Sequence, residues 1–139
     1  TKNPFVKFTA KQAKVIPIAT KSEDPKVLRE AFDKIKSELH GGEVICIFPE
    51  GKITFDGKMN SFKRGIETII QDTPVPVIPM ALDGLWGGLY SRIDHEKPWY
   101  KRRVKPWAKV KLKIGKALDA SEVTALRLEE EVRSLLTNS

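Results

Sequence analysis

Cysteine and histidine are scarce in this 139-residue chain, and long apolar runs are missing from it. The one cysteine, Cys46, stands between Ile45 and Ile47, so we expect a small buried core residue in a reducing compartment. No apolar run approaches the ~18 residues that a membrane-spanning helix requires, and no signal peptide is visible. We identify no set of metal ligands and expect no bound cofactor. Because the chain opens on Thr1 and not on methionine, we expect it to be part of a longer protein.

Acidic residues are missing from two segments of a chain whose formal net charge is +7. Residues 1–21 carry lysines and no acid, and residues 97–116 carry lysines and arginines and no acid. Basic segments of this kind attract phosphate-bearing partners, which include nucleic acid, anionic lipid and phosphorylated ligands. A solvated face would have the same composition, so both interpretations stay open at this point.

The overall composition is that of a folded soluble domain. The hydrophobic fraction is 40% and the charged fraction is 31%, values typical of globular proteins. The length fits one domain with a real core, and we treat residues 1–139 as the major, C-terminal part of a single domain.

Apolar periodicity predicts four strands. Residues 14–19 and 75–82 are short apolar runs, and residues 44–48 form an unbroken one, which is typical of a strand covered on both faces. In residues 109–114 lysine alternates with Val110, Leu112 and Ile114, so this strand should have one solvated face.

Three helices are predicted between and after these strands. Asp24 and Pro25 supply an N-cap and a first-turn proline for a helix that a pair of glycines ends. A short helix should follow, and a last helix should start near Ser121. The apolar positions that predict them are Leu28, Ala31, Phe32, Ile35 and Leu39, then Phe62, Ile66, Ile69 and Ile70, then Val123, Leu126, Leu128, Val132 and Leu135. The order indicates an α/β fold with a mixed, largely parallel central sheet flanked by helices.

The segment FPEGKIT follows directly on the unbroken apolar strand. In open α/β sheets, ligands bind beyond the carboxyl ends of the strands. The proline stiffens the exit, and the glycine permits a strained turn or a close approach of backbone to ligand. The glutamate can accept hydrogen bonds, while the lysine and threonine can donate to phosphate oxygens. The candidate binding residues are Phe48, Pro49, Glu50, Gly51, Lys52 and Thr54. A plain turn with a surface Glu–Lys pair is the alternative.

Three blocks of this sequence, taken in order, resemble the later motifs of the glycerophospholipid (PlsC-like) acyltransferase family. They are FPEG at 48–51, FKRG at 62–65 and VPVIPMAL at 75–82, and the resemblance extends over about residues 14–89. The form FPEGKIT is similar to the branch that acts on 2-acylglycerophosphoethanolamine and related lysophospholipids, which is often fused to a transporter or an acyl-carrier-protein synthetase. The resemblance implies transfer of a fatty acyl chain from acyl carrier protein or coenzyme A, as co-substrate, to a lysophospholipid hydroxyl.

The chain departs from the commonest form of the family at the acceptor-binding position. That form reads FPEGTRS, and its arginine is implied in binding the acceptor's phosphate, whereas Ile53 stands at that place here. The nearest cation is Lys52, one residue earlier, so the phosphate would be met by Lys52 differently or by Lys63 or Arg64, with Gly65 completing the block. Upstream, the second block of the family often ends in arginine, where this chain has Thr20.

A histidine and aspartate pair that the resemblance implies is missing. In the family, a His-x4-Asp motif supplies the general base for the acceptor hydroxyl and the aspartate that orients it. Five residues beyond His40 stands Ile45, and five beyond His95 stands Tyr100, so neither histidine fits. We interpret His40 as a helix C-terminal residue. No catalytic residue is therefore assigned in this chain, and we expect the pair upstream of Thr1, so that the chain alone should be inactive.

The segment from Trp99 to Lys113 interleaves aromatic and cationic side chains. Aromatic rings and cations together are favoured at the interface of an anionic membrane, and an acidic carrier protein would be attracted as well. We therefore expect a location in the cytoplasm at the inner face of the cell membrane, peripherally or as a domain of a membrane protein. A solvated loop whose tryptophans fill the core is the alternative.

Two other functions remain for this sequence. A non-catalytic module that binds membranes or anions would keep the pocket and lack the base. Nucleic-acid binding would use the basic segments, but no RRM, KH or helix-turn-helix signature is present, and we expect no nucleic-acid partner.

Overall fold

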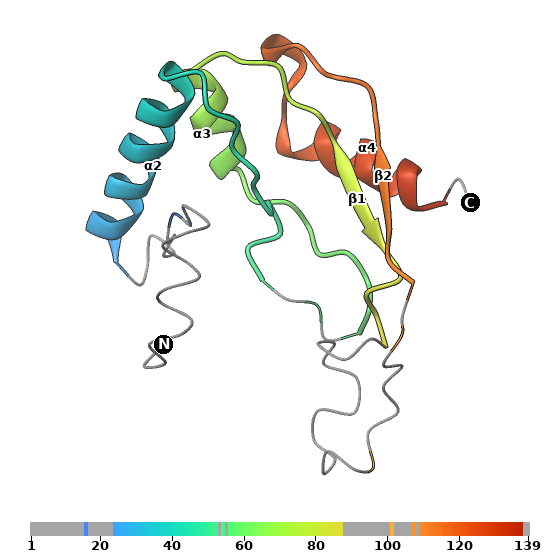
Figure 1. Ribbon diagram of the computed structural model, residues 1–139. Coiled ribbons are helices and arrows are strands. Elements are labelled where there is room, and N and C mark those ends of the chain that lie inside the picture. The colour runs from blue at the N-terminus through green and yellow to red at the C-terminus, as the bar shows by residue number, and fades with distance from the viewer. Residues whose placement is uncertain are drawn as a thin grey trace. The chain divides into compact units, whose positions relative to one another are not determined.

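The computed structural model describes residues 24–52, 56–87 and 109–137, together with Ile16, Thr54, Lys101 and Trp107. Its elements are α2 (Pro25–His40), α3 (Gly65–Asp72), β1 (Met80–Asp83), β2 (Lys111–Ile114), the 3-10 turn η2 (Ala120–Glu122) and α4 (Ala125–Thr137), as Figure 1 shows. The chain divides into two compact units, residues 1–46 and residues 47–139. Helices and a small sheet agree with the predicted α/β class. The strand predicted at 14–19 lies outside the described residues except for Ile16.

Helix α2 is built as its sequence predicts. The Asp24 side chain accepts hydrogen bonds from the backbone N–H groups of Lys26 (3.0 Å) and Val27 (3.2 Å), and Pro25 occupies the first turn. Ala31 and Ile35 are buried. The helix ends at His40, whose Nδ1 lies 2.8 Å from the Lys36 carbonyl oxygen, so the assignment of this histidine to a helix C-terminus is confirmed.

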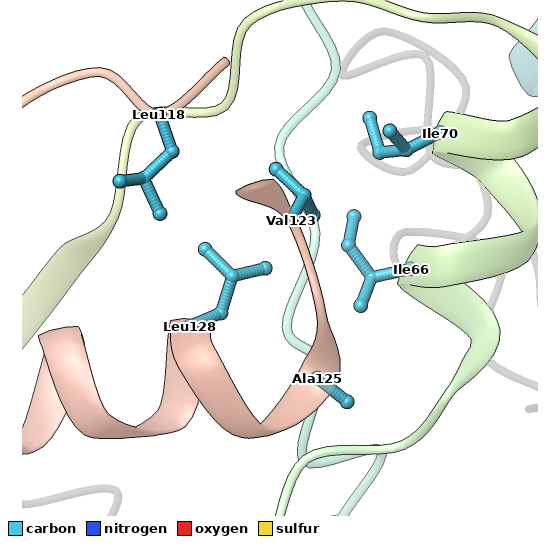
Figure 2. Close-up of a cluster of buried hydrophobic side chains, with 6 residues drawn as sticks. All are labelled: Ile66, Ile70, Leu118, Val123, Ala125 and Leu128. Carbon is cyan, nitrogen blue, oxygen red and sulfur yellow. The ribbon is translucent and has the colours of Figure 1, made fainter. Parts of the chain in front are cut away.

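The core of the second unit is formed where α3, η2 and α4 meet. Ile66 and Ile70 on α3 point toward Val123 and Leu128, which belong to the C-terminal segment (Figure 2). The cluster consists of Ile66, Ile70, Leu118, Val123, Ala125 and Leu128. Helix α4 begins at Ala125, later than predicted, because Thr124 caps it by accepting from the Arg127 N–H at 3.1 Å. Leu126 stands two residues before the buried Leu128, about 200° around the helix, so it faces solvent and its predicted core position is wrong.

The two strands form an antiparallel pair. Met80 lies opposite Ile114 and Leu82 opposite Leu112, and the pairing continues in an isolated bridge between Val77 and Leu118. Helix α4 packs against this pair (Figure 1). No parallel strand pair occurs within the described residues, where the sheet has two strands.

The strand predicted at residues 44–48 is not formed. Val44 is 94% and Phe48 is 71% exposed, and Cys46 is also exposed, so the expected burial of this cysteine is wrong. An unbroken apolar run becomes a strand when neighbouring strands pair with its backbone and other elements cover its faces. The described part of the chain supplies no pairing strand for residues 44–48.

Candidate functional site

The FPEG segment forms a tight backbone turn. The Gly51 N–H donates to the Phe48 carbonyl oxygen at 3.1 Å. Gly51 has a φ of 65°, a conformation that glycine adopts at low cost, and a Cβ there would lie 3.3 Å from Cε of Lys63. The turn therefore requires a glycine at position 51, as the sequence predicts.

Backbone contacts join the FPEG turn to the FKRG block. The Lys63 N–H donates to the Pro49 carbonyl oxygen at 2.8 Å. One residue earlier, the Phe62 N–H donates to Oε2 of Glu129, on α4, at 2.9 Å. The two blocks, eleven or more residues apart in sequence, are thus held side by side and anchored to the C-terminal helix.

Glu50 closes the loop that connects the two blocks. Its Oε2 accepts the backbone N–H of Asn60 at 2.6 Å and the Asn60 side-chain amide Nδ2 at 3.0 Å. Both groups are partly buried. Hydrogen bonds to an ionised carboxylate are stronger than those between neutral groups, so this pair fixes both ends of the loop 51–59.

A second contact set orders the middle of the loop. The Thr54 hydroxyl donates to Oδ1 of Asp56 at 3.0 Å, and the Lys58 N–H donates to the same oxygen at 3.0 Å. These two hydrogen bonds, the Lys58 bond above all, hold the pKa of Asp56 below its usual range. The one hydroxyl proton of Thr54 is thus used inside the loop in this conformation, and Thr54 as a phosphate donor stays a prediction.

An indole ring covers the loop at Gly57. Gly57 has a φ of 80°, and a Cβ there would come within 2.8 Å of the Trp86 ring. Because only a hydrogen fits between this backbone and the ring, the glycine is required by both φ and space.

Three predicted cations surround the turn. The side chains of Lys52, Lys63 and Arg64 are exposed, and no ion pair joins them to any residue in the part of the chain that the structure describes. Arg64 is also the N-cap residue of α3, and Gly65 begins that helix. Unpaired cations beside a helix N-terminus are able to bind an anion such as a phosphate monoester.

Glu129 links the site to α4. It accepts from the Arg133 guanidinium at 2.8 Å (Nη2) and 3.2 Å (Nε), besides the Phe62 N–H. The Arg133 side chain first, and the Phe62 N–H second, hold the pKa of Glu129 below its usual range. The carboxylate therefore stays ionised near neutral pH and continues to accept the hydrogen bond from the Phe62 N–H of the FKRG block.

Sequence reasoning did not find three residues that shape this site. Asn60, Trp86 and Glu129 stand outside the three motif blocks. Their contacts span long stretches of sequence, so no periodicity or spacing reveals them. Gly57 between Asp56 and Lys58 is a turn signal that was available.

The remaining candidate features of the described residues are a groove, a possible metal site and a possible membrane span. An open groove of about 740 Å³ lies between α3 and the η2–α4 segment, and it contains none of the predicted site residues. No group of three or more metal-ligating side chains occurs within the described ranges. Among the helices described, none combines the length and the apolar character that crossing a bilayer demands.

Comparison with known proteins identifies the family of this chain. The family model described as Acyltransferase matches residues 1–83, more than half of the chain. A chloroplastic 1-acyl-sn-glycerol-3-phosphate acyltransferase of Brassica napus is 31% identical over 58% of this chain and 23% of its own length. A probable 1-acyl-sn-glycerol-3-phosphate acyltransferase of Mycoplasma pneumoniae is 26% identical over 57% of this chain and 31% of its own length.

A solved structure gives the same result for the fold. The crystal structure of the 1-acyl-sn-glycerophosphate acyltransferase PlsC from Thermotoga maritima matches 97% of this chain with a TM-score of 0.68 and 26% identity. The match covers 52% of that chain, and the match to the two curated relatives covers about a quarter to a third of theirs. The α/β fold predicted from the sequence is confirmed by this likeness.

Proposed function

Since this chain belongs to the acyltransferase family, as the match over residues 1–83 shows, we propose that it forms the acceptor-binding part of a lysophospholipid acyltransferase. The reaction transfers a fatty acyl chain from a thioester of acyl carrier protein or coenzyme A to a free hydroxyl of the acceptor. The acceptor belongs to the 1-acylglycerol-3-phosphate and acylglycerophosphoethanolamine class. The curated relatives and the solved PlsC, which are named as 1-acylglycerol-phosphate acyltransferases, support the first of these two acceptors.

The observation that carries the proposal is the closed FPEG loop with its unpaired cations. The Glu50–Asn60 contact and the Lys63–Pro49 backbone bond fix the loop, and Lys52 leaves it toward solvent. A fixed loop lets a cation meet the acceptor's phosphate without a large ordering cost. The roles of Phe48 and Pro49 are to shape the turn, and those of Lys63, Arg64 and Gly65 are to complete the anion site.

Replacing Lys52 by alanine tests the phosphate contact. In the longer protein, Lys52→Ala should lower kcat/KM for the lysophospholipid about 10–100-fold, because a hydrogen bond between charged groups contributes ~1.5–3 kcal/mol. Steady-state kinetics with varied acceptor at saturating donor measure the effect. Lys58→Ala, which removes another exposed lysine of the same loop, is the matched control and should change kcat/KM little. If kcat/KM is unchanged in Lys52→Ala, Lys52 does not bind the phosphate, and Lys63 or Arg64 would be assigned that contact.

A non-catalytic module that binds membranes or anions is the second candidate function. The observation that favours it is the lack of a His-x4-Asp motif between Thr1 and Ser139. The reading frame upstream of Thr1 separates the two candidates: a His-x4-Asp motif there supports the enzyme, and a frame without one supports the module. Fusion to a transporter or to an acyl-carrier-protein synthetase would be visible in the same frame.

Membrane contact is part of the proposal. Trp107 is 92% exposed, so this tryptophan does not fill the core, and Lys101 and Lys109 are exposed as well. The other aromatic and cationic residues of the predicted interface, from Trp99 to Lys105, lie outside the described residues except for Lys101. We propose peripheral attachment to the cytoplasmic face of the membrane.

Vesicle sedimentation tests this attachment. The chain should bind anionic vesicles more tightly than neutral ones, and the preference should weaken as the Debye length falls from ~10 Å at 0.1 M salt to ~3 Å at 1 M. Replacing Lys101, Arg102 and Arg103 by glutamine should abolish the preference. Replacing Lys26, Lys34 and Lys36 of α2 by glutamine removes the same charge and should preserve it. Equal binding by both triple variants at low salt would show that the basic segment is only a solvated face.

A further inference from the structure

An apolar surface covers one face of β1 and β2. From Val77 to Asp83 the side chains alternate strictly, with Pro79 and Ala81 buried and Ile78, Met80 and Leu82 exposed. Such alternation is expected of a strand, but here the residues left exposed are the large apolar ones.

The partner strand completes this surface. Leu112 and Ile114 are 55% and 59% exposed, and they stand directly opposite Leu82 and Met80. Residues opposite each other in an antiparallel pair share a face of the sheet. We define the apolar sheet face as Ile78, Met80, Leu82, Val110, Leu112 and Ile114.

The opposite face of the sheet is covered by α4. Ala81 is buried, and Lys113, paired with it across the strands, reaches α4, where its Nζ lies 3.5 Å from the Leu136 carbonyl oxygen. Lys113 also lies 3.8 Å from Asp83. The lysine side of β2 therefore packs on the helix and the apolar side meets water, the reverse of what an amphipathic strand at the edge of a core shows.

We propose that the apolar sheet face is the docking surface for the part of the acyltransferase domain that these 139 residues do not span, through an apolar helix or strand of that part. The comparison with the solved acyltransferase indicates what covers the face. The match includes 97% of this chain but only 52% of the solved chain. The other half of such a domain must bury apolar surface of its own. The inference rests on family membership and not on the proposed activity.

The composition of the face favours this occupant over a membrane. All six side chains are aliphatic or thioether, as on strands that helices cover in α/β domains, and none is aromatic. A face that rests at a membrane interface is expected to carry Trp or Tyr. A second copy of this chain fits less well, since each copy carries a formal net charge of +7 and two copies would repel one another.

Thiol labelling tests the docking surface. In a Cys46→Ser background, Leu112→Cys and the control Leu126→Cys place one thiol on the face or on the exposed side of α4, where Leu126 is 68% exposed. In the 139-residue chain both thiols should react with a maleimide at similar rates. In the protein translated from the full reading frame, the rate at position 112 should fall at least about 10-fold, because opening of a packed interface then limits access. The rate at position 126 should stay unchanged.

Each other outcome overturns the proposal. Equal labelling at position 112 in both proteins would mean that nothing covers the face, and a full frame without further domain sequence would mean the same. Protection that grows with the concentration of the 139-residue chain would identify a second copy as the occupant. Protection that appears only when phosphatidylglycerol vesicles are added would identify a membrane. Because no readout is enzymatic, these results are independent of whether the acyl transfer itself is confirmed.

Discussion

Incubated with a lysophospholipid and an acyl thioester, the 139-residue chain is expected to form no acylated product above the uncatalysed rate. A hydroxyl group attacks a thioester slowly while it keeps its proton, and a general base contributes roughly 10²–10⁴-fold. Neither His40 nor His95 is followed five residues later by an aspartate. His40 in addition lies at the C-terminus of α2, with its Nδ1 at the Lys36 carbonyl oxygen.

Mass spectrometry of the lipid product is the suitable readout, because the exposed Cys46 would itself react in a thiol-release assay. The protein translated from the full reading frame serves as the positive control under the same conditions. Turnover by the 139-residue chain at about 1 s⁻¹ or faster, an ordinary enzyme rate, would show that these residues contain their own base. In that case the assignment of His40 to a purely structural role at the end of α2 would be wrong.

The helices could be predicted because their signals are local. The cap at Asp24, the glycines after His40 and the isoleucines of α3 each act within a few residues. The structure contains all three predicted helices, although α3 begins only at Gly65, beyond Phe62, and α4 only at Ala125. The exception, Leu126, is exposed because it stands two residues before the buried Leu128, on the opposite side of α4. A residue at that spacing lies outside the i, i+3, i+4 stripe that a helix buries, so it does not belong to the core face.

The strands were harder because their burial depends on distant partners. The apolar run at 44–48 becomes a strand only if other strands pair with it, and the described residues contain no strand that does. For β2, the sequence shows that lysines alternate with apolar residues, but it does not show which side meets α4. That choice is made by the packing of the whole domain, which a period of two residues does not encode.

The candidate site shows the same division between local and distant information. The FPEG block identifies the turn from the sequence alone, with Gly51 in the left-handed conformation and Lys52 exposed beside it. The contacts that hold this turn come from Asn60 and Glu129, ten residues beyond Glu50 and sixty-seven residues beyond Phe62. Neither contact leaves a periodic signal, so the rigidity of the loop becomes visible only in three dimensions.

Glu50→Ala is expected to have the largest effect among single substitutions in the loop. In the longer protein it should lower kcat/KM for the acceptor about 100-fold, since two charged hydrogen bonds to Asn60 are lost and together contribute about 3 kcal/mol. The loss should appear mainly as a higher KM for the lysophospholipid, with KM for the acyl donor little changed, because the loop positions Lys52. Initial-rate kinetics with each substrate varied in turn measure this split.

Two further variants separate a positioning role from a chemical one. Glu50→Gln keeps one oxygen that can accept both Asn60 hydrogen bonds, so it should retain much more activity than Glu50→Ala. Asn60→Ala removes the side-chain bond at 3.0 Å but leaves the backbone bond, and it should fall between wild type and Glu50→Ala. If Glu50→Gln were as impaired as Glu50→Ala while Asn60→Ala behaved as wild type, the charge of Glu50 would act directly on the reaction. The loop closure seen here would then be incidental to catalysis.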